Sequence, residues 1–324
     1  MTSHQKKILG YSFKIIIVVL AAYFIYHKLS DNTNLTNFLN LINRLSKVKV
    51  WATIVIILLL MFVNWLLESA KWKFLISKIE DISFYRAVES VFCGLTWAIF
   101  TPNRIGEYGG RIFFLSPRKR IKGMVAMSVG QIAQMVITNV LGALALLWFI
   151  YNFKPLDQWL FVAICVLVLG FCFFFLLFYF NISWLEKSLS SIGFLKRFKS
   201  FFSVLGEYHR LELVKVMLYS LARFAVFTTQ YLFIIHLLIP NIPYYESALM
   251  VLLLFFVQSA LPSLDLLDVG VRSLTATYFF SFITHQEIAV MAAAALIWLV
   301  NLIIPAILGS YFVFKLNFFD HNNT

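Results

Sequence analysis

The segment from Thr101 to Arg111 concentrates side chains that could bind an anion within an apolar part of the chain. It contains the candidate binding residues Arg104, Gly106, Glu107, Gly109, Gly110 and Arg111. A guanidinium binds phosphate through paired hydrogen bonds, and glycine lets the backbone approach a ligand closely. Ionisable groups at membrane depth cost at least about 2.5–3.5 kcal/mol each, so they normally face a wet cavity. A solvated loop explains the same composition, and both interpretations stay open at this point.

A second segment, from Pro262 to Arg272, repeats this pattern. It carries the candidate binding residues Asp265, Asp268, Gly270 and Arg272. Helices interrupted at matching positions of two halves are typical of a transporter's central binding site. Pro262 follows Pro102 by nearly half the chain, so we predict one domain, 1–324, with pseudo-repeat halves near 1–155 and 156–324.

The spacing of Asp265 and Asp268 also fits a different chemistry. Two carboxylates three residues apart share a helix face and could hold Mg²⁺ against a diphosphate. A membrane-embedded transferase acting on a polyprenyl (di)phosphate lipid is therefore an alternative function. Such enzymes ordinarily supply a second acidic cluster, which is not found in this sequence.

Arg223 lies about ten residues inside an apolar run, about 15 Å along a helix, and should need a partner there. It could line the path of a lipid headgroup, or it could form a structural ion pair with an acid such as Glu107 or Asp268. Amide side chains inside predicted spans more often join helices than touch a substrate. We nevertheless expect three of them to line a cavity: Gln131, Gln134 and Gln258.

The composition requires these residues to be positioned by membrane helices. The chain is 61% hydrophobic and 13% charged with a net charge of +12, whereas soluble domains average about 45–50% apolar and 25% charged residues. This excludes an ordinary soluble enzyme, a disordered protein and a disulfide-framed module. The cysteines form no C-x-x-C pair and the histidines show no ligand spacing, so we expect no metal, no cofactor and no nucleic-acid partner.

The predicted fold is an all-α, polytopic membrane bundle of about 7–8 spans, because a helix of roughly 20 apolar residues crosses the hydrocarbon with every backbone group paired. We place the spans near 8–27, 50–67, 123–151, 157–180, 213–239, 245–262 and 287–314. Two stretches, 87–115 and 263–283, are expected to be interrupted or re-entrant helices. If 87–115 enters and leaves on one face, the basic loops around it share one side, which favours a cytoplasmic N-terminus.

The motifs resemble those of a known family. Thr101-Pro102-Asn103-Arg104-Ile105-Gly106-Glu107 resembles the T-P-x-R-x-G-E motif of the flippase domain of lysylphosphatidylglycerol synthetases and their stand-alone relatives. Lys71-Trp72-Lys73 and the stretch from Leu261 to Arg272 resemble two further motifs of that family. The chain departs from the later of these two motifs, the one that begins at Leu261. It has Asp265-Leu266-Leu267-Asp268 where a glycine pair is usual, and Ser273 where glutamate is usual.

The resemblance implies broken helices around a lipid-headgroup cavity and a role in moving a lipid between leaflets. The leading hypothesis is a flippase for an anionic phospholipid, an aminoacyl lipid or a polyprenyl-phosphate sugar, with Arg104, Arg111 and Arg272 holding phosphate, and with Glu107 orienting these arginines or meeting a cationic part of the headgroup. No soluble synthetase domain and no ATP-binding loop are found, so we expect a stand-alone, non-enzymatic member. Expected partners are membrane lipids and lipid- or sugar-transferases of the envelope, at the cell membrane. A scaffold for envelope enzymes is a second alternative.

Overall fold

The computed structural model describes residues 45–99, 101, 104–191, 199–261 and 268–315, together with residues 36, 39–40 and 42–43. Within these ranges the secondary structure is helical and contains no strand. The predicted all-α fold is therefore confirmed for the described chain. The first predicted span, 8–27, lies outside the described residues.

Five stretches of the described chain are long and apolar enough to cross a membrane. Four are single helices: α3 (Lys47–Ile76), α6 (Arg120–Phe153), α7 (Gln158–Phe180) and α10 (Arg210–Leu238). The fifth runs through α13 (Glu287–Trp298), a π-helical turn (Leu299–Ile303) and α14 (Ile304–Lys315). These helices confirm the spans predicted at 50–67, 123–151, 157–180, 213–239 and 287–314.

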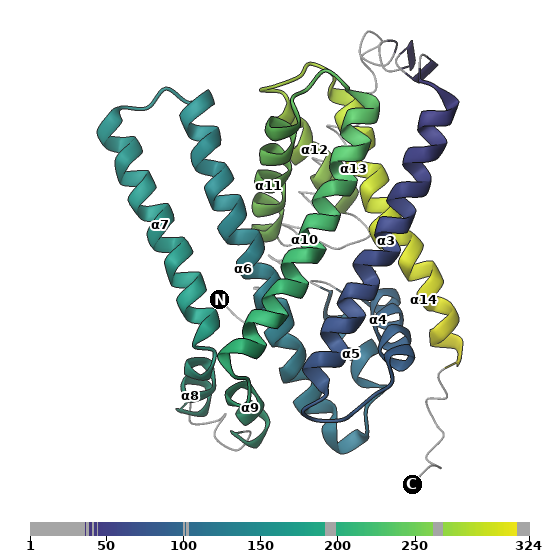
Figure 1. Cartoon of the computed structure of the whole chain (residues 1–324), viewed down its shortest axis with the longest axis vertical. Helices are drawn as coiled ribbons and strands as arrows, with labels where there is room; N and C mark the ends of the chain where they lie inside the picture. The colour runs from purple at the N-terminus through teal and green to yellow at the C-terminus, as the bar shows by residue number, and fades with distance from the viewer. Residues whose placement is uncertain are drawn as a thin grey trace, which may run out of the picture.

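The interrupted stretch 87–115 folds into an antiparallel pair of short helices. α4 (Phe84–Ile99) and α5 (Ile105–Ile112) pack with Gly94 against Gly110 and Trp97 against Gly106, so sequence positions advance on one helix as they recede on the other. The chain therefore turns back where α4 meets α5. Figure 1 shows this hairpin beside the lower half of α3.

A second pair of short helices lies at the opposite end of the bundle. α11 (Tyr244–Ala260) has 17 residues, which gives about 26 Å, shorter than the roughly 30 Å of hydrocarbon. α12 (Asp268–Phe280) follows it after residues 262–267, which are not described. The predicted span 245–262 is thus one half of a hairpin. In Figure 1 α11 and α12 occupy the upper half of the molecule, so the two hairpins enter from opposite ends.

Basic segments gather at the end from which the α4–α5 hairpin enters. There the Lys78 ammonium lies 2.7 Å from the Glu212 carboxylate, and the Tyr208 hydroxyl donates to the Leu75 carbonyl at 2.7 Å. Burial raises the pKa of the Tyr208 phenol, so it remains a donor. The 3₁₀ turn Pro117–Lys119, α8 (Ser183–Ser191) and α9 (Lys199–Gly206) lie at this end as well (Figure 1).

The last long helix joins the two hairpins. α14 packs tightly on α4, since a Cβ at Gly309 would lie 2.0 Å from the Phe92 carbonyl oxygen. The Thr96 hydroxyl also donates to the Ala306 carbonyl at 2.8 Å. Before the π-helical turn in the sequence, α13 packs on α12. The turn itself is where the helix changes neighbours, and π-helical turns often mark functional positions.

Candidate functional site

The turn between α4 and α5 is shaped by Thr101. Its hydroxyl accepts a hydrogen bond of 2.7 Å from the Gly106 amide and lies 3.2 Å from the Trp97 carbonyl, to which it can donate. Arg104 has a left-handed backbone with φ 57°, a conformation that a side-chain-bearing residue adopts only at a cost. Thr101 therefore holds the start of α5 against the end of α4, and Arg104 is the residue that precedes α5.

The glycines of the motif have a packing role. A Cβ at Gly106 would lie 2.3 Å from the Trp97 carbonyl oxygen, and one at Gly110 would lie 2.5 Å from the Gly94 Cα. A Cβ at Gly109 would have room, because its nearest neighbour, Cε3 of the Trp97 ring, would lie 4.0 Å away. Gly106 and Gly110 thus bring α5 close to α4, and all three glycines lie at this helix contact.

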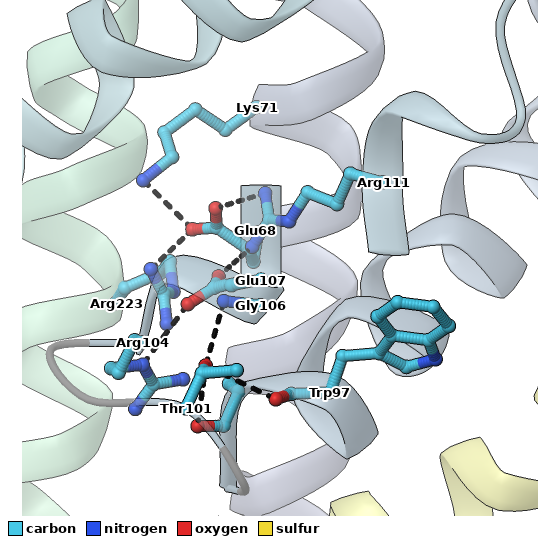
Figure 2. Close-up of polar contacts among 10 residues, drawn as sticks. Glu68, Lys71, Trp97, Thr101, Arg104, Gly106, Glu107, Arg111 and Arg223 are labelled. Carbon is cyan, nitrogen blue, oxygen red and sulfur yellow. Dashed lines mark hydrogen bonds and ion pairs between the residues drawn. The ribbon is translucent and has the colours of Figure 1, made fainter. Parts of the chain in front are cut away.

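A buried carboxylate, Glu68 on α3, is the centre of an ion cluster. The Lys71 ammonium approaches its Oε2 to 2.7 Å, and Nη1 of Arg111 donates to its Oε1 at 2.7 Å. Nη1 of Arg223, on α10, donates to Oε2 as well. Figure 2 shows three cations from three helices converging on this one side chain.

Glu107, on α5, is the second carboxylate of the cluster. It accepts from Nε of Arg104 at 3.0 Å and from Nη2 of Arg111, as Figure 2 shows. Arg111 therefore bridges Glu107 and Glu68. Among the described residues, the cluster holds two carboxylates and four cationic groups, so it carries an excess of positive charge.

Aromatic and amide groups complete the support of these arginines. The Arg111 guanidinium lies 5.9 Å from the Trp72 ring centroid, and that of Arg223 lies 5.2 Å from the Trp65 ring centroid. Such stacking favours a cation. Nε of Arg223 also donates to Oδ1 of Asn64 at 3.1 Å. Each arginine is thereby held in one orientation.

A cavity of about 490 Å³ lies between the hairpins, within the long helices. Its lining includes three arginines from three elements: Arg104 at the start of α5, Arg223 on α10 and Arg272 on α12. Arg223 is close to the middle of α10, about 20 Å from either end. The amides that line the cavity are Asn64, Gln131, Gln134, Gln258 and Asn301.

Exposed apolar residues lie in or close in sequence to the cavity lining. Met135, on the middle of α6, lines the cavity and is 43% exposed. Ile105, next to Arg104, is 63% exposed, and Leu261, at the end of α11, is 38% exposed. The exposed residues provide an apolar environment, and the arginines of the lining provide a polar one inside the cavity.

The structure divides the predicted site residues into separate groups. Arg104, Arg223 and Arg272 line the cavity, together with Gln131, Gln134 and Gln258. Glu107 and Arg111 lie behind that lining, in the ion cluster. Gly270 is buried in α12.

Two predicted site residues are not placed by the structure. Asp265 lies outside the described residues, and the side chain of Asp268, the first residue of α12, is not described. A metal-binding role for this pair stays a prediction.

Arg223 has the acidic partner that its position inside an apolar helix requires, and its role in a headgroup path stays a prediction. It lines the cavity, and its acidic partner is Glu68. Sequence reasoning missed Glu68 because the predicted span stopped at residue 67, whereas α3 continues to Ile76. The signal was present: Glu68 and Lys71 are three residues apart, so they share a helix face where they can pair within a longer span.

Asn64 and Asn301 were also missed as cavity residues. Asn64 lies one turn before Glu68 on α3, and Asn301 lies in the π-helical turn. A polar residue four positions from a buried acid shares its helix face, which would have identified Asn64.

Comparison with known proteins places this arrangement in a family context. A family model described as the lysylphosphatidylglycerol synthase TM region matches residues 11–309. The match spans both hairpins, the ion cluster and every described residue that lines the cavity. No curated protein and no solved structure matches the chain.

Proposed function

Since the chain belongs to the family of the lysylphosphatidylglycerol synthase TM region, we propose that this multi-pass membrane protein moves an anionic lipid between leaflets. The headgroup occupies the cavity between the hairpins, and the hydrocarbon chains stay in the bilayer beside the exposed Met135. The volume of about 490 Å³ falls within the roughly 300–1,000 Å³ of small-molecule sites. Phospholipids, aminoacyl lipids and polyprenyl-phosphate sugars all carry a group of the required charge.

One observation carries the proposal: three arginines from separate elements meet in one cavity near the middle of the long helices. Arginines at membrane depth are costly, and they are normally retained where an ion or a polar ligand passes. Their guanidinium groups suit the oxygens of a phosphate.

The residues around the cavity have distinct proposed roles. Arg104, Arg223 and Arg272 bind the phosphate. Glu68 positions Arg223 and Glu107 positions Arg104 through the ion pairs described above, with Arg111 holding the two carboxylates together. Among the described residues of the ion cluster, the two carboxylates face four cationic groups, so the excess charge is positive.

The proposed setting is the cell membrane, with the basic end of the bundle in the cytoplasm. Lys and Arg are enriched in cytoplasmic loops, and the basic segments of the described chain lie at the end from which α4 and α5 enter. We expect movement to be driven by a gradient, a partner or downhill lipid flow, and we expect transport without covalent change of the lipid.

Reconstitution into proteoliposomes with tail-labelled phosphatidylglycerol tests the proposal. Leaflet exchange is followed by quenching of the outer-leaflet label. Arg272→Ala should slow exchange at least about tenfold, because a charge-assisted hydrogen bond contributes roughly 1.5–3 kcal/mol. Arg86→Ala removes an exposed arginine of α4 outside the cavity and should leave the rate unchanged.

Two outcomes would overturn the proposal. Exchange no faster than in protein-free liposomes excludes transport of this lipid class, and a wild-type rate in Arg272→Ala excludes the cavity as the route. Covalent conversion of a polyprenyl-phosphate lipid that requires Mg²⁺ and Asp265 would support the transferase alternative instead.

A further inference from the structure

Two cations of the ion cluster share a single oxygen of Glu68. The Lys71 ammonium lies 2.7 Å from Oε2, and Nη1 of Arg223 donates to the same atom, as Figure 2 shows. The two cations differ in their access to the cavity. Arg223 lines it and its side chain is 15% exposed, whereas Lys71 is 1% exposed and is not among the lining residues. A headgroup in the cavity would therefore contact Arg223 and not Lys71.

The position of Lys71 is fixed by helix packing. It follows Glu68 by three residues on α3, so the two side chains share a helix face. On the neighbouring helix α6, Gly130 leaves room for the lysine, because a Cβ there would lie 3.3 Å from Cε of Lys71 and 2.8 Å from Cδ1 of Leu75. The ammonium is therefore held beside the Glu68 carboxylate by its packing as well as by its charge.

A phosphate bound by Arg223 would bring a second anion close to Glu68. One guanidinium would then serve two negative groups that compete for it. Buried charges are weakly screened, so an uncompensated Glu68 would both hold Arg223 back and repel the phosphate. The Lys71 ammonium neutralises part of the charge on the oxygen that Arg223 contacts, and it thereby reduces both effects.

Two uncharged residues can keep Arg223 oriented while Glu68 holds it less tightly. Nε of Arg223 donates to Oδ1 of Asn64 at 3.1 Å, and its guanidinium lies 5.2 Å from the Trp65 ring centroid. These contacts orient the guanidinium without neutralising it. Glu68 is the carboxylate that pairs with Arg223, so the compensation of Glu68 determines how much of the Arg223 charge a ligand meets.

We propose that Lys71 is a positioning residue: by neutralising Glu68, it keeps Arg223 available to the phosphate of the lipid. Lys71 acts through Glu68 and does not touch the headgroup. This inference rests on the proposed function, because the phosphate occupies the same cavity. It gives the first residue of the Lys71-Trp72-Lys73 motif a role in anion binding.

Binding of a short-chain phosphatidylglycerol to the purified full chain in detergent tests the inference. Titration calorimetry gives the dissociation constant and the number of sites separately. Lys71→Met keeps a long side chain and removes its charge, so it should raise the dissociation constant about tenfold, within the range for groups coupled in one ion-pair network. Misfolding would lower the number of sites instead, so a merely structural role of Lys71 is distinguished from a positioning role.

A second substitution checks that Lys71 acts through Glu68. Adding Glu68→Gln to Lys71→Met removes the uncompensated carboxylate and keeps an amide oxygen that can accept from Arg223. The double variant should bind phosphatidylglycerol at least about threefold more tightly than Lys71→Met. Lys78→Met is the matched control, because Lys78 also pairs with a glutamate, Glu212 at 2.7 Å, but lies outside the cavity lining. Its dissociation constant should equal that of the wild-type protein.

The outcomes separate the inference from the proposed function. An unchanged dissociation constant in Lys71→Met, or a double variant that binds more weakly than Lys71→Met, overturns the role of Lys71 and leaves lipid transport intact. Absence of both binding and leaflet exchange of phosphatidylglycerol in the wild-type protein overturns both.

Discussion

The guanidinium of Arg223 on α10 donates to the carboxylate of Glu68 on α3, and this contact ties two long helices together beside the cavity. Glu68 also meets Arg111 and Lys71. The Glu68 carboxylate therefore reduces the mutual repulsion of three neighbouring cations. Loss of a buried ionic partner is much more costly than loss of a surface pair.

We expect Glu68→Gln to destabilise the protein by about 3–5 kcal/mol, because buried cations lose their partner. The measurement is unfolding in detergent by heat or denaturant. Glu80→Gln is the control: Glu80 lies 3.8 Å from the half-exposed Lys119, and its loss should cost less than about 1 kcal/mol. Adding Lys71→Met to Glu68→Gln removes one of the stranded cations and should recover part of the stability. A double variant no more stable than Glu68→Gln would contradict the cluster.

Gly110 and Gly109 should respond in opposite directions to the same substitution. Gly110→Ala places a methyl group 2.5 Å from the Gly94 Cα, so it should force α4 and α5 apart and cost about 1–3 kcal/mol. Gly109→Ala meets only a ring carbon at 4.0 Å, and it should gain up to about 1 kcal/mol from the better helix former. Thermal unfolding of the two variants gives the comparison. Equal effects would rule out the close helix contact.

Two substitutions of Arg104 should differ in stability, although both should abolish transport. Its left-handed backbone costs about 1–2 kcal/mol with any side chain, and glycine removes that cost. Its ion pair with Glu107 is partly exposed. We therefore expect Arg104→Gly to be more stable than Arg104→Ala by about 1 kcal/mol, while both lose lipid exchange. The two variants are compared by unfolding and by leaflet exchange; an Ala variant more stable than the Gly variant would refute the left-handed turn.

The hairpin arrangement predicts a labelling pattern for single introduced cysteines. Asp81 and Arg118 flank the α4–α5 hairpin and are exposed, and Asn241 is exposed at the opposite end. In sealed vesicles, an impermeant thiol reagent should reach Asp81→Cys and Arg118→Cys from one side and Asn241→Cys from the other. The unmodified protein gives the background, since Cys93 and Cys172 are buried. Labelling of Asp81→Cys and Arg118→Cys from different sides would mean that the hairpin crosses the membrane.

Uniformly apolar helices could be predicted closely from the sequence. The span predicted at 157–180 corresponds to α7, Gln158–Phe180, because no charged residue interrupts it. The α3 span was predicted too short, since Glu68 and Lys71 have the composition of a solvated helix end. Only the fold reveals that Glu68 has buried partners on two other helices, Arg111 on α5 and Arg223 on α10.

The glycines show a second limit of sequence reasoning. Their spacing indicates that something approaches the backbone, and a ligand was the expected neighbour. The structure instead places α4 against Gly106 and Gly110. A sequence reports that a side chain is not tolerated at a position, but the identity of the neighbour depends on tertiary packing. The arginines were easier to identify, because their burial cost alone points to a polar cavity.

The π-helical turn from Leu299 to Ile303 has a mechanical consequence. The helix segment before it, α13, is packed on the α12 arm, and the segment after it, α14, is clamped to the α4 arm through Gly309 and Thr96. One continuous helix therefore contacts both hairpins, and its π-helical turn contributes Asn301 and Leu302 to the cavity wall. We therefore expect a change of bend at this turn to alter the distance between the two hairpins.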